Sequence, residues 1–316
     1  MIDRRPWDSL ASRLGDRLIF GAPLADLTRY GVGGSAALLA RPESAEEVRD
    51  LLAVRNETGL PLSILGGGSN TLFTEAGFAG LVMRIGQGFQ VVEALGDTGL
   101  RAGAGAHTAA VAEAAAERGL RGLEGLAGIP GRFGGALMMN AGSFGQDVGS
   151  CVERLFGLDA QGREFSLGKA ELRYEYRRLS GLAEGAVLLG AELRLEAGHP
   201  EDIKRTVAEN LARRSASQPK GFRSAGSVFK NPAGHSAGRL IEECGLKGAT
   251  IGGAAVSEVH ANFIVVQGKA ESGHILELVD KIRAAVYNQR GVVLEPEIKI
   301  IGPTGPLTLA SPGGGQ

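Results

Sequence analysis

Residues 122–142 read GLEGLAGIPGRFGGALMMNAG, and this stretch decides how the rest of the chain is interpreted. It holds seven glycines and only three charged or amide side chains, those of Glu124, Arg132 and Asn140. Glycine costs conformational entropy, so it is favoured where the main chain needs a positive φ or passes very close to another group. The stretch therefore indicates backbone that packs against something large and flat.

Two further glycine clusters point the same way. Residues 65–70 read LGGGSN, whose consecutive N–H groups can form a nest for a phosphate, and residues 30–34 read YGVGG. A turn and a strand are expected after LGGGSN, and neither GxGxxG nor GxxxxGK[ST] occurs, so Rossmann and Walker loops are not predicted. Each cluster alone is equally compatible with a flexible turn. Together they predict a large phosphorylated cofactor bound between two lobes of an enzyme.

The composition is that of an ordinary soluble globular protein. The 316 residues include 34 basic and 35 acidic side chains, for a net charge of −1, so neither nucleic acid nor a membrane surface is an expected partner. Cys151 and Cys244 are too few for a disulfide framework, and the five histidines lack metal-ligand spacing, so no metal is expected. MIDRRPWDSL lacks the apolar run of a signal peptide, and we expect a cytoplasmic protein.

The pattern of apolar residues predicts mixed α/β lobes. Helices are expected at 43–59, 108–118, 201–216 and 273–289, and strands at 60–65, 186–195, 254–257, 262–266 and 292–301. A hairpin is expected at 152–167, around Asp159 to Gly162. The expected domains are a first lobe at 1–85, a second lobe at 86–200, a C-terminal α/β domain at 201–302 and a disordered tail at 303–316.

Six motifs resemble those of a known family, in the same order along the chain. They are TRYGVGG at 28–34, LGGGSN at 65–70, GLAGIPGRFGGALMMNAG at 125–142, YEYRR at 174–178, SAGSVFKNP at 224–232 and LEPEIKIIG at 294–302. The family is that of the UDP-N-acetylenolpyruvoylglucosamine reductases, MurB. AGRLIEECGLKG at 237–248 and VSEVHANF at 256–263 resemble its shorter form, which lacks an inserted tyrosine-bearing loop.

The resemblance implies an α+β protein with a vanillyl-alcohol-oxidase (PCMH-type) FAD-binding fold of two lobes, plus a C-terminal substrate domain. The resemblance further implies that FAD is bound non-covalently and that NADPH is the co-substrate, which reduces the flavin and leaves. The reduced flavin then passes hydride to the enolpyruvyl methylene carbon of UDP-N-acetylglucosamine enolpyruvate, in peptidoglycan precursor synthesis. A monomer is expected. The residues expected to bind FAD are Tyr30, Gly31, Gly33, Leu65, Gly66, Gly67, Gly68, Ser69, Asn70, Gly128, Ile129, Pro130, Gly135, Asn140, Ala141 and Gly142.

The resemblance also assigns the chemistry to three residues. Ser227 is implied as the donor of a proton to the carbanionic intermediate, and Arg177 and Glu297 as the groups that stabilise it. Judged from the residues alone, Ser227 is as compatible with a turn or helix cap. Arg177 is as compatible with a solvated cation beside Arg178, because the strand register decides which of them faces inward.

Tyr176, Lys230 and Asn231 are expected to bind the substrate, although Lys230 is equally compatible with an exposed surface cation. The basic residues Arg213, Arg214 and Lys220 could bind the diphosphate of the substrate, although a solvated helix end is the favoured interpretation. Relatives often carry lysine where this chain has Val259, so the substrate contacts there stay open. The alternatives for the whole protein are another FAD oxidoreductase of the same fold, such as an alcohol or hydroxy-acid oxidase, and a non-catalytic nucleotide-binding module.

Overall fold

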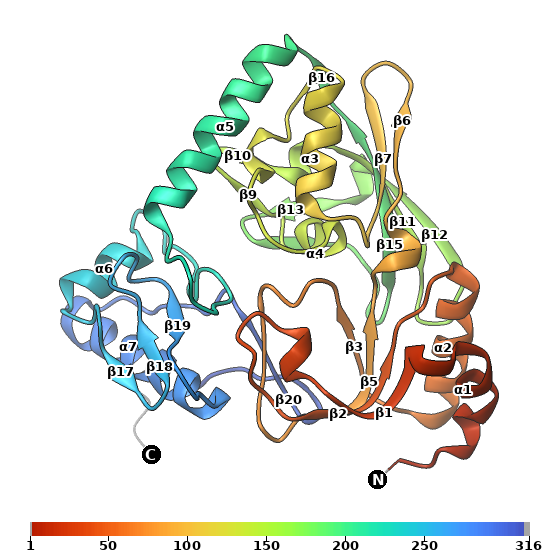
Figure 1. The fold of residues 1–316 in the computed structure, drawn as a ribbon, viewed down its shortest axis with the longest axis horizontal. Coiled ribbons are helices and arrows are strands. Elements are labelled where there is room, and N and C mark those ends of the chain that lie inside the picture. The colour runs from red at the N-terminus through yellow and green to blue at the C-terminus, as the bar shows by residue number, and fades with distance from the viewer. Residues whose placement is uncertain (1, 313–316) are drawn as a thin grey trace. The chain divides into compact units, whose positions relative to one another are not determined.

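The computed structural model describes residues 2–312. The contacts between residues divide the chain into two compact units, each built from segments that are distant in sequence (Figure 1). Unit 1 comprises residues 1–20, 38–67 and 81–214, and unit 2 comprises residues 21–37, 68–80 and 215–316. The division into three domains with boundaries near 85 and 200 stays a prediction.

The helix predicted at 43–59 is confirmed and belongs to unit 1. Helix α2 (Ala45–Thr58) begins at Ser44, whose side chain accepts a hydrogen bond from the Glu47 N–H at 3.2 Å, and ends at Gly59 with a φ of +66°. Its apolar stripe packs with α1 (Asp8–Leu14) and with buried residues that include Trp7, Leu38, Leu81 and Met83. The adjoining four-stranded sheet has the order β1 (Leu18–Pro23), β2 (Ser35–Ala40), β5 (Phe78–Arg84), β3 (Leu62–Leu65).

The second layer of unit 1 is an antiparallel five-stranded sheet. Its order is β12 (Glu164–Gly168), β11 (Val152–Leu158), β15 (Val187–Arg194), β7 (Gly99–Gly103), β6 (Val92–Leu95). Helices α3 (Thr108–Glu117) and α4 (Phe133–Met138) bury their apolar residues against Leu100, Leu155 and Leu193 of this sheet. The predicted hairpin is confirmed, because β11 and β12 pair across a turn in which Gly162 has a φ of +77°.

Short elements complete unit 1. They are β8 (Leu120–Arg121), β9 (Gly142–Ser143), β10 (Gln146–Asp147), β13 (Arg173–Glu175), β14 (Arg178–Ser180) and β16 (Glu196–Ala197), with turns of 3₁₀ helix between them. Helix α5 (Pro200–Ser217) belongs to this unit as far as Arg214. Its Asn210 amide donates to the Glu124 carbonyl at 3.1 Å, so the helix is attached directly to the glycine-rich stretch.

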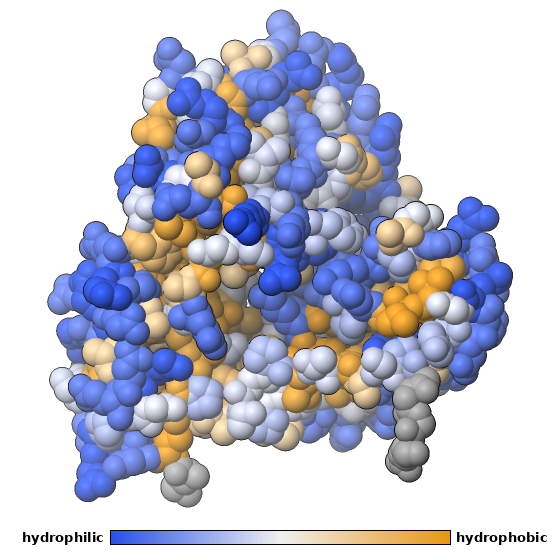
Figure 2. All heavy atoms as spheres, turned by 180° about the vertical axis from the view of Figure 1, so that it is seen from behind, coloured by the Kyte–Doolittle hydropathy of each residue, from blue (hydrophilic) through white to orange (hydrophobic). Residues whose placement is uncertain are grey.

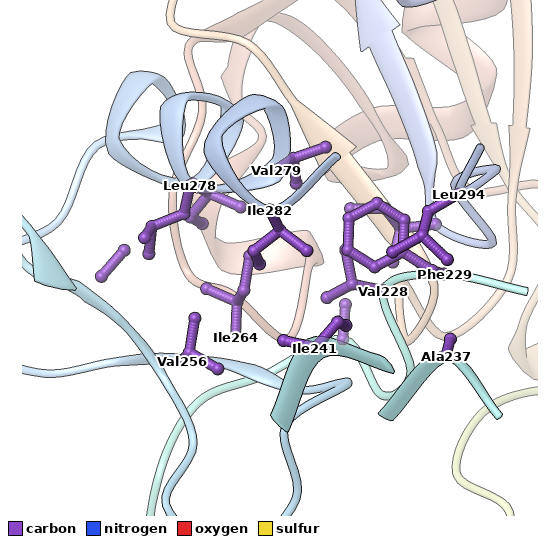
Figure 3. Packing of buried hydrophobic residues seen from close by; sticks show 14 of the residues in the cluster. Val228, Phe229, Ala237, Ile241, Val256, Ile264, Leu278, Val279, Ile282 and Leu294 are labelled. Atoms are coloured by element: carbon purple, nitrogen blue, oxygen red, sulfur yellow. The ribbon is translucent and has the colours of Figure 1, made fainter. Parts of the chain in front are cut away.

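Unit 2 is built around α7 (Ser272–Arg290). Its apolar side packs on α6 (Ala237–Glu243) and on a three-stranded sheet of β17 (Thr250–Ile251), β18 (Ala254–Val256) and β19 (Ile264–Val266). Figure 3 shows Ile282 and Val279 of α7 above Val228 and Phe229, with Leu294 beside them. Tyr30, Val32 and Leu72 also lie in this core, so residues from the N-terminal part of the sequence help to hold unit 2 together.

The last strand is shorter than predicted. β20 is Lys299–Gly302 and pairs with β4 (Thr71–Phe73) and β21 (Gly305–Pro306), whereas residues 292–298 form no strand. Pro296 has no N–H to donate, and the Glu297 N–H instead bonds to the Val228 carbonyl at 2.7 Å. The expected disorder at 303–316 is wrong for Gly305 and Pro306, which are paired, and residues 313–316 lie outside the described part.

Among residues 2–312, no helix combines the length and the apolar character needed to cross a membrane. Figure 2 shows a face of the molecule on which hydrophilic residues predominate and hydrophobic residues gather in separate patches.

The carboxylate of Glu75 attaches the β4–β5 connection to the start of α7. It accepts hydrogen bonds from the Ser272 N–H, the Ser272 hydroxyl and the Gly273 N–H, the last at 3.2 Å. Burial by itself raises the pKa of Glu75, but these hydrogen bonds outweigh it and place the pKa below its usual value. A carboxyl with a lowered folded-state pKa stabilises the fold above its unfolded-state pKa, and this contribution is lost as the pH falls through the folded-state pKa.

We therefore predict that Glu75→Gln lowers the free energy of unfolding by about 1 kcal/mol at pH 7, because a neutral amide is a weaker acceptor at a helix N-terminus. The difference should shrink in acid. Urea denaturation at several pH values measures it, with Glu277→Gln on the exposed side of α7 as the control. A deficit that is equally large at every pH, or equally large in the control, would contradict the prediction.

Candidate active site

Two of the glycine clusters meet inside unit 1. A Cβ at Gly67 would lie 2.8 Å from the Cα of Gly131, closer than real Cβ atoms come, so only glycine lets the two main chains approach this far. A Cβ at Gly66 would meet only the side chain of Arg132, at 3.2 Å, and Gly135 in α4 faces open space. The structure thus brings Gly66 and Gly67 against Gly131 and Arg132 of the glycine-rich stretch.

The other half of the LGGGSN motif lies in unit 2, beside the YGVGG motif. Gly68 has a φ of +61°, and a Cβ there would clash with the Leu27 carbonyl. Gly31 and Gly33 also have positive φ, and Gly33 packs against the Phe73 carbonyl. The Tyr30 side chain is fully buried in the core of unit 2, so only its main chain is available to a ligand.

Three non-glycine residues have positive φ among the residues described, and all lie in one region of unit 1. They are Asn140 (+41°), Phe144 (+54°) and Arg177 (+58°). Phe144 and Gly145 form the two-residue turn between β9 and β10, and both have the positive φ of a type I′ hairpin. Such conformations cost free energy in residues with a side chain, and they concentrate at functional sites.

Arg177 lies in the tight turn between β13 and β14, where Glu175 pairs with Arg178. Its guanidinium donates to the Gly142 carbonyl at 3.2 Å and to the Asn140 carbonyl at 3.5 Å, and it lies 5.0 Å from the centre of the Tyr176 ring. The turn, rather than strand alternation, therefore decides which of the two arginines faces the glycine-rich stretch. The Tyr176 side chain is exposed.

Asn140 holds this arrangement in place. Its amide donates to the Glu175 carbonyl at 3.0 Å, and its side-chain oxygen accepts from the Gly149 N–H at 2.9 Å. The side chain is buried and bonded to the protein at both ends, so we expect its contact with a cofactor to be through the main chain.

A second arginine, Arg214 at the end of α5, lies next to Arg177. Its side chain packs against Gly128, and its guanidinium is 3.5 Å from the Ser143 hydroxyl. Burial, together with the nearby charge of Arg177, lowers the pKa of Arg214. The interpretation of this helix end as solvated is therefore wrong for Arg214. Spacing could not reveal this, because the packing of α5 against the glycine-rich stretch is a long-range contact.

The remaining residues of the predicted cofactor set in unit 1 lie near these two arginines or on the adjoining core. Leu65 is the buried last residue of β3, and Gly128 has a φ of +73°. Ile129 and Ala141 pack on the core of the five-stranded sheet, and Gly142 is the first residue of β9. Pro130 lies between Ile129 and Gly131.

In unit 2, Ser227 lies at a crossing of three segments. It follows Gly226, which has a φ of +80°, and forms a β-bridge with Phe263. Its neighbour Val228 donates to the Asn262 carbonyl at 2.8 Å and accepts from the Glu297 N–H. The hydroxyl itself has no hydrogen-bond partner in the part of the chain that the structure describes, so the interpretation as a cap is wrong.

Glu297 and Asn70 lie at the same crossing. The Asn70 amide donates to the Glu297 carbonyl at 3.0 Å, and the Asn70 carbonyl accepts from the Lys299 N–H at 2.9 Å. The LGGGSN, SAGSVFKNP and LEPEIKIIG motifs therefore meet in one place. Lys299, which carries no recognisable signal in the sequence, lies beside them. Desolvation lowers the pKa of its ammonium group, although part of the side chain remains exposed.

The candidate substrate residues of unit 2 are held by neighbours within that unit. The Lys230 ammonium pairs with Glu295 at 3.1 Å, and the Asn231 side chain accepts from the Ala237 N–H at 2.9 Å. His260 packs edge-on against Phe263, and burial lowers the pKa of its imidazole, in agreement with a structural role. Val259 beside it is exposed.

The residues present fit a dinucleotide cofactor such as FAD. The consecutive glycines at 66–68 allow a main-chain conformation whose N–H groups can form a nest for a phosphate. The exposed Gly135, which meets nothing within 4 Å, leaves room for a flat group against α4.

Because the backbone at Asn140 is strained, a glycine there should destabilise the protein less than an alanine, the reverse of the usual order. We predict that Asn140→Ala and Asn140→Gly both destabilise the protein, because each removes two buried hydrogen bonds. The alanine variant should be less stable than the glycine variant by about 1 kcal/mol, since only glycine adopts a positive φ without strain. Urea denaturation of both measures this, and an alanine variant as stable as the glycine variant would count against strain at this position.

Comparisons with known proteins agree with this geometry. Residues 36–168 match a family model described as an FAD binding domain, and residues 218–301 match one described as the UDP-N-acetylenolpyruvoylglucosamine reductase, C-terminal domain. The UDP-N-acetylenolpyruvoylglucosamine reductase of Pelobacter propionicus is 43% identical over 90% of this chain and 96% of its own length. That of Clostridioides difficile is 39% identical over 89% of this chain and 92% of its own.

A solved structure extends the likeness to the fold. The crystal structure of UDP-N-acetylenolpyruvylglucosamine reductase (MurB) from Thermus caldophilus superposes with a TM-score of 0.77 at 37% identity, covering 90% of this chain and 97% of that one. The expected fold class, a two-lobed FAD-binding fold with a C-terminal domain, is confirmed. The matches span nearly the whole length on both sides, and the chain belongs to the UDP-N-acetylenolpyruvoylglucosamine reductase family.

Proposed function

We propose that this enzyme uses NADPH and FAD to reduce UDP-N-acetylglucosamine enolpyruvate to UDP-N-acetylmuramate, a precursor of peptidoglycan. Relatives at about 40% identity carry the name of this reductase over nearly their whole length. Family membership favours this reaction over an alcohol or hydroxy-acid oxidase and over a module that binds a nucleotide without turnover. We further propose that it acts in the cytoplasm as a monomer, with no nucleic-acid partner.

When bound, FAD would supply the hydride-transfer chemistry, with NADPH as the source of the hydride and the methylene carbon of the enolpyruvyl group as its acceptor. This addition moves electrons onto the neighbouring carbon and its carboxylate. The chain must then stabilise that charge and provide one proton to the carbon.

We assign the proton to Ser227. An alcohol is a weak acid, so this role requires a strongly basic acceptor, which a carbanion next to a carboxylate is. The observation that carries the assignment is the half-buried Ser227 hydroxyl, which bonds to no other described residue although its neighbours on both sides are held in fixed geometry.

We assign stabilisation of the charge to Arg177 and Glu297. The Arg177 guanidinium donates to the carbonyl oxygens of Asn140 and Gly142, and a guanidinium group is suited to bind the planar carboxylate of the substrate. Arg214 adds a second positive charge next to Arg177. Glu297 is attached through its main chain to the segment that bears Ser227, and we propose that its carboxyl group orients the serine or shares its proton.

The remaining predicted contacts stay proposals. We expect Lys230 and Asn231 to contact the diphosphate or the carboxylate of the substrate, with Tyr176 nearby, and this requires the Lys230 ammonium to leave Glu295. A salt bridge with an exposed glutamate is weak, so this exchange costs about 1 kcal/mol or less.

The two half-reactions separate the proposed roles. We predict that Ser227→Ala is reduced by NADPH at the parent rate, because no proton donor is needed in that step. Its reoxidation by UDP-N-acetylglucosamine enolpyruvate should slow by about 10²–10⁴-fold, the contribution of a positioned general acid. Anaerobic stopped-flow absorbance of the flavin measures both rates.

Ser224→Ala is the matched control, because it removes a hydroxyl three residues away in the same segment. It should leave both rates close to those of the parent. Equal reoxidation in Ser227→Ala and the parent would remove Ser227 from the mechanism, and slow reduction by NADPH would indicate general damage to the site.

A further inference from the structure

An open cavity lies on the side of the five-stranded sheet that faces away from α3 and α4. Leu100, Ala102 and Leu155 pack with those two helices, and because side chains alternate along a strand, Arg101 and Phe156 point to the opposite side. The cavity has a volume of about 510 Å³, and all the residues that line it belong to unit 1. Sites for small molecules have volumes of about 300–1,000 Å³, so this cavity is large enough to hold one.

Much of the wall of this cavity is aromatic. Phe89, Phe156 and Phe165 line it, and none of the three is fully buried. Gly103 and Gly157 also line it, and a Cβ at Gly103 would clash with the Phe89 carbonyl, while one at Gly157 would lie 2.9 Å from the Phe165 ring. Neither position therefore admits a larger side chain that would fill the space. Aromatic surface left open in this way is suited to bind a flat apolar group.

One cation of the cavity lacks an acidic partner. The Arg101 guanidinium lies 4.6 Å from the centre of the Phe156 ring, and among residues 2–312 it has neither a hydrogen bond nor an acidic oxygen within 4.0 Å. The other charged residue of the lining, Glu164, is paired with Arg49 at 3.3 Å. The cavity therefore presents one positive charge beside an aromatic wall.

The surroundings of Arg101 favour a ligand with a single negative charge. Glu93 and Glu192 are its neighbours on the adjacent strands β6 and β15, and Glu192 is paired with Arg154 at 3.4 Å. These carboxylates would repel a doubly charged phosphate more strongly than a monoanion. The planar fork of a guanidinium also matches the two oxygens of a carboxylate.

We propose that this cavity binds a small amphipathic carboxylate, with the carboxylate on Arg101 and a flat apolar group against Phe89, Phe156 and Phe165. Burial of the apolar group supplies most of the affinity, and the guanidinium fixes the orientation and selects for the negative charge. The cavity lies across the sheet from α4, which carries Gly135 of the predicted cofactor set. The inference is therefore independent of the proposed reductase reaction.

Two probes of nearly the same shape test the role of the charge, namely 1-naphthaleneacetate and its neutral amide, 1-naphthaleneacetamide. Each is titrated into the full-length chain in the presence of FAD, and isothermal titration calorimetry measures the affinity. Arg101→Gln removes the cation, and Ser166→Trp fills the cavity from β12, a strand in which an aromatic residue is tolerated. Arg163→Gln is the matched control, because Arg163 pairs with Asp159 in the β11–β12 turn and does not line the cavity.

We expect the parent to bind the acid about tenfold more tightly than the amide, the usual effect of one charge-assisted hydrogen bond. Arg101→Gln should abolish this preference, Ser166→Trp should weaken the binding of both probes, and Arg163→Gln should behave as the parent.

Four results would overturn the proposal. The parent could bind acid and amide equally, or bind neither at concentrations up to about 10 mM, which corresponds to negligible affinity. Arg101→Gln could keep the preference for the acid, or Ser166→Trp could keep the full affinity for both probes. Displacement of the acid by UDP-N-acetylglucosamine enolpyruvate would also contradict it, because the probe would then lie in the candidate active site.

Discussion

The close approach of Gly67 to Gly131 is the constraint on which the rest of the candidate site depends. Any side chain at Gly67 would push apart the LGGGSN loop and the stretch that leads into α4. Because these main chains touch, Arg132 lies on Gly66 and α4 begins beside the loop. The glycines therefore do more than permit turns, since they let distant segments of unit 1 pack main chain against main chain.

Backbone strain in unit 1 positions a guanidinium group that the proposed chemistry uses. The positive φ at Asn140 and Arg177 is maintained by buried hydrogen bonds of the Asn140 side chain and by the short β13–β14 turn. The strain places one guanidinium against the carbonyls of residues 140 and 142, with Arg214 as a second cation nearby. In unit 2, main-chain hydrogen bonds join three segments next to Ser227. The Ser227 hydroxyl has no hydrogen-bond partner among the described residues.

Local patterns predicted much of the fold. Capping residues predicted where α2 begins and ends, and a turn predicted the β11–β12 hairpin. Helical periodicity predicted the apolar stripe of α7, and all three features are present. The strand expected at 292–301 was wrong over its first part, because Pro296 prevents regular pairing there and the N–H groups after it bond to Val228. The pattern of apolar residues does not predict whether a neighbouring strand pairs with a segment.

The candidate site was predictable only where motifs are specific. The resemblance named Ser227, Arg177 and Glu297, and no spacing argument from the residues alone would have chosen Arg177 over Arg178. Arg41, Arg84 and Lys299 were not predicted, and the burial of Arg214 was not foreseen, because the charge of each is buried or crowded only through contacts between distant segments. Isolated cations in a chain of nearly balanced charge give no local signal.

The most direct test of the central claim is the visible spectrum of the purified chain under anaerobic conditions. The account predicts a yellow protein that bleaches with NADPH and regains its colour when UDP-N-acetylglucosamine enolpyruvate is added. A protein that regains colour only with oxygen would contradict the substrate assignment, and a colourless chain that does not take up added FAD would contradict the account as a whole.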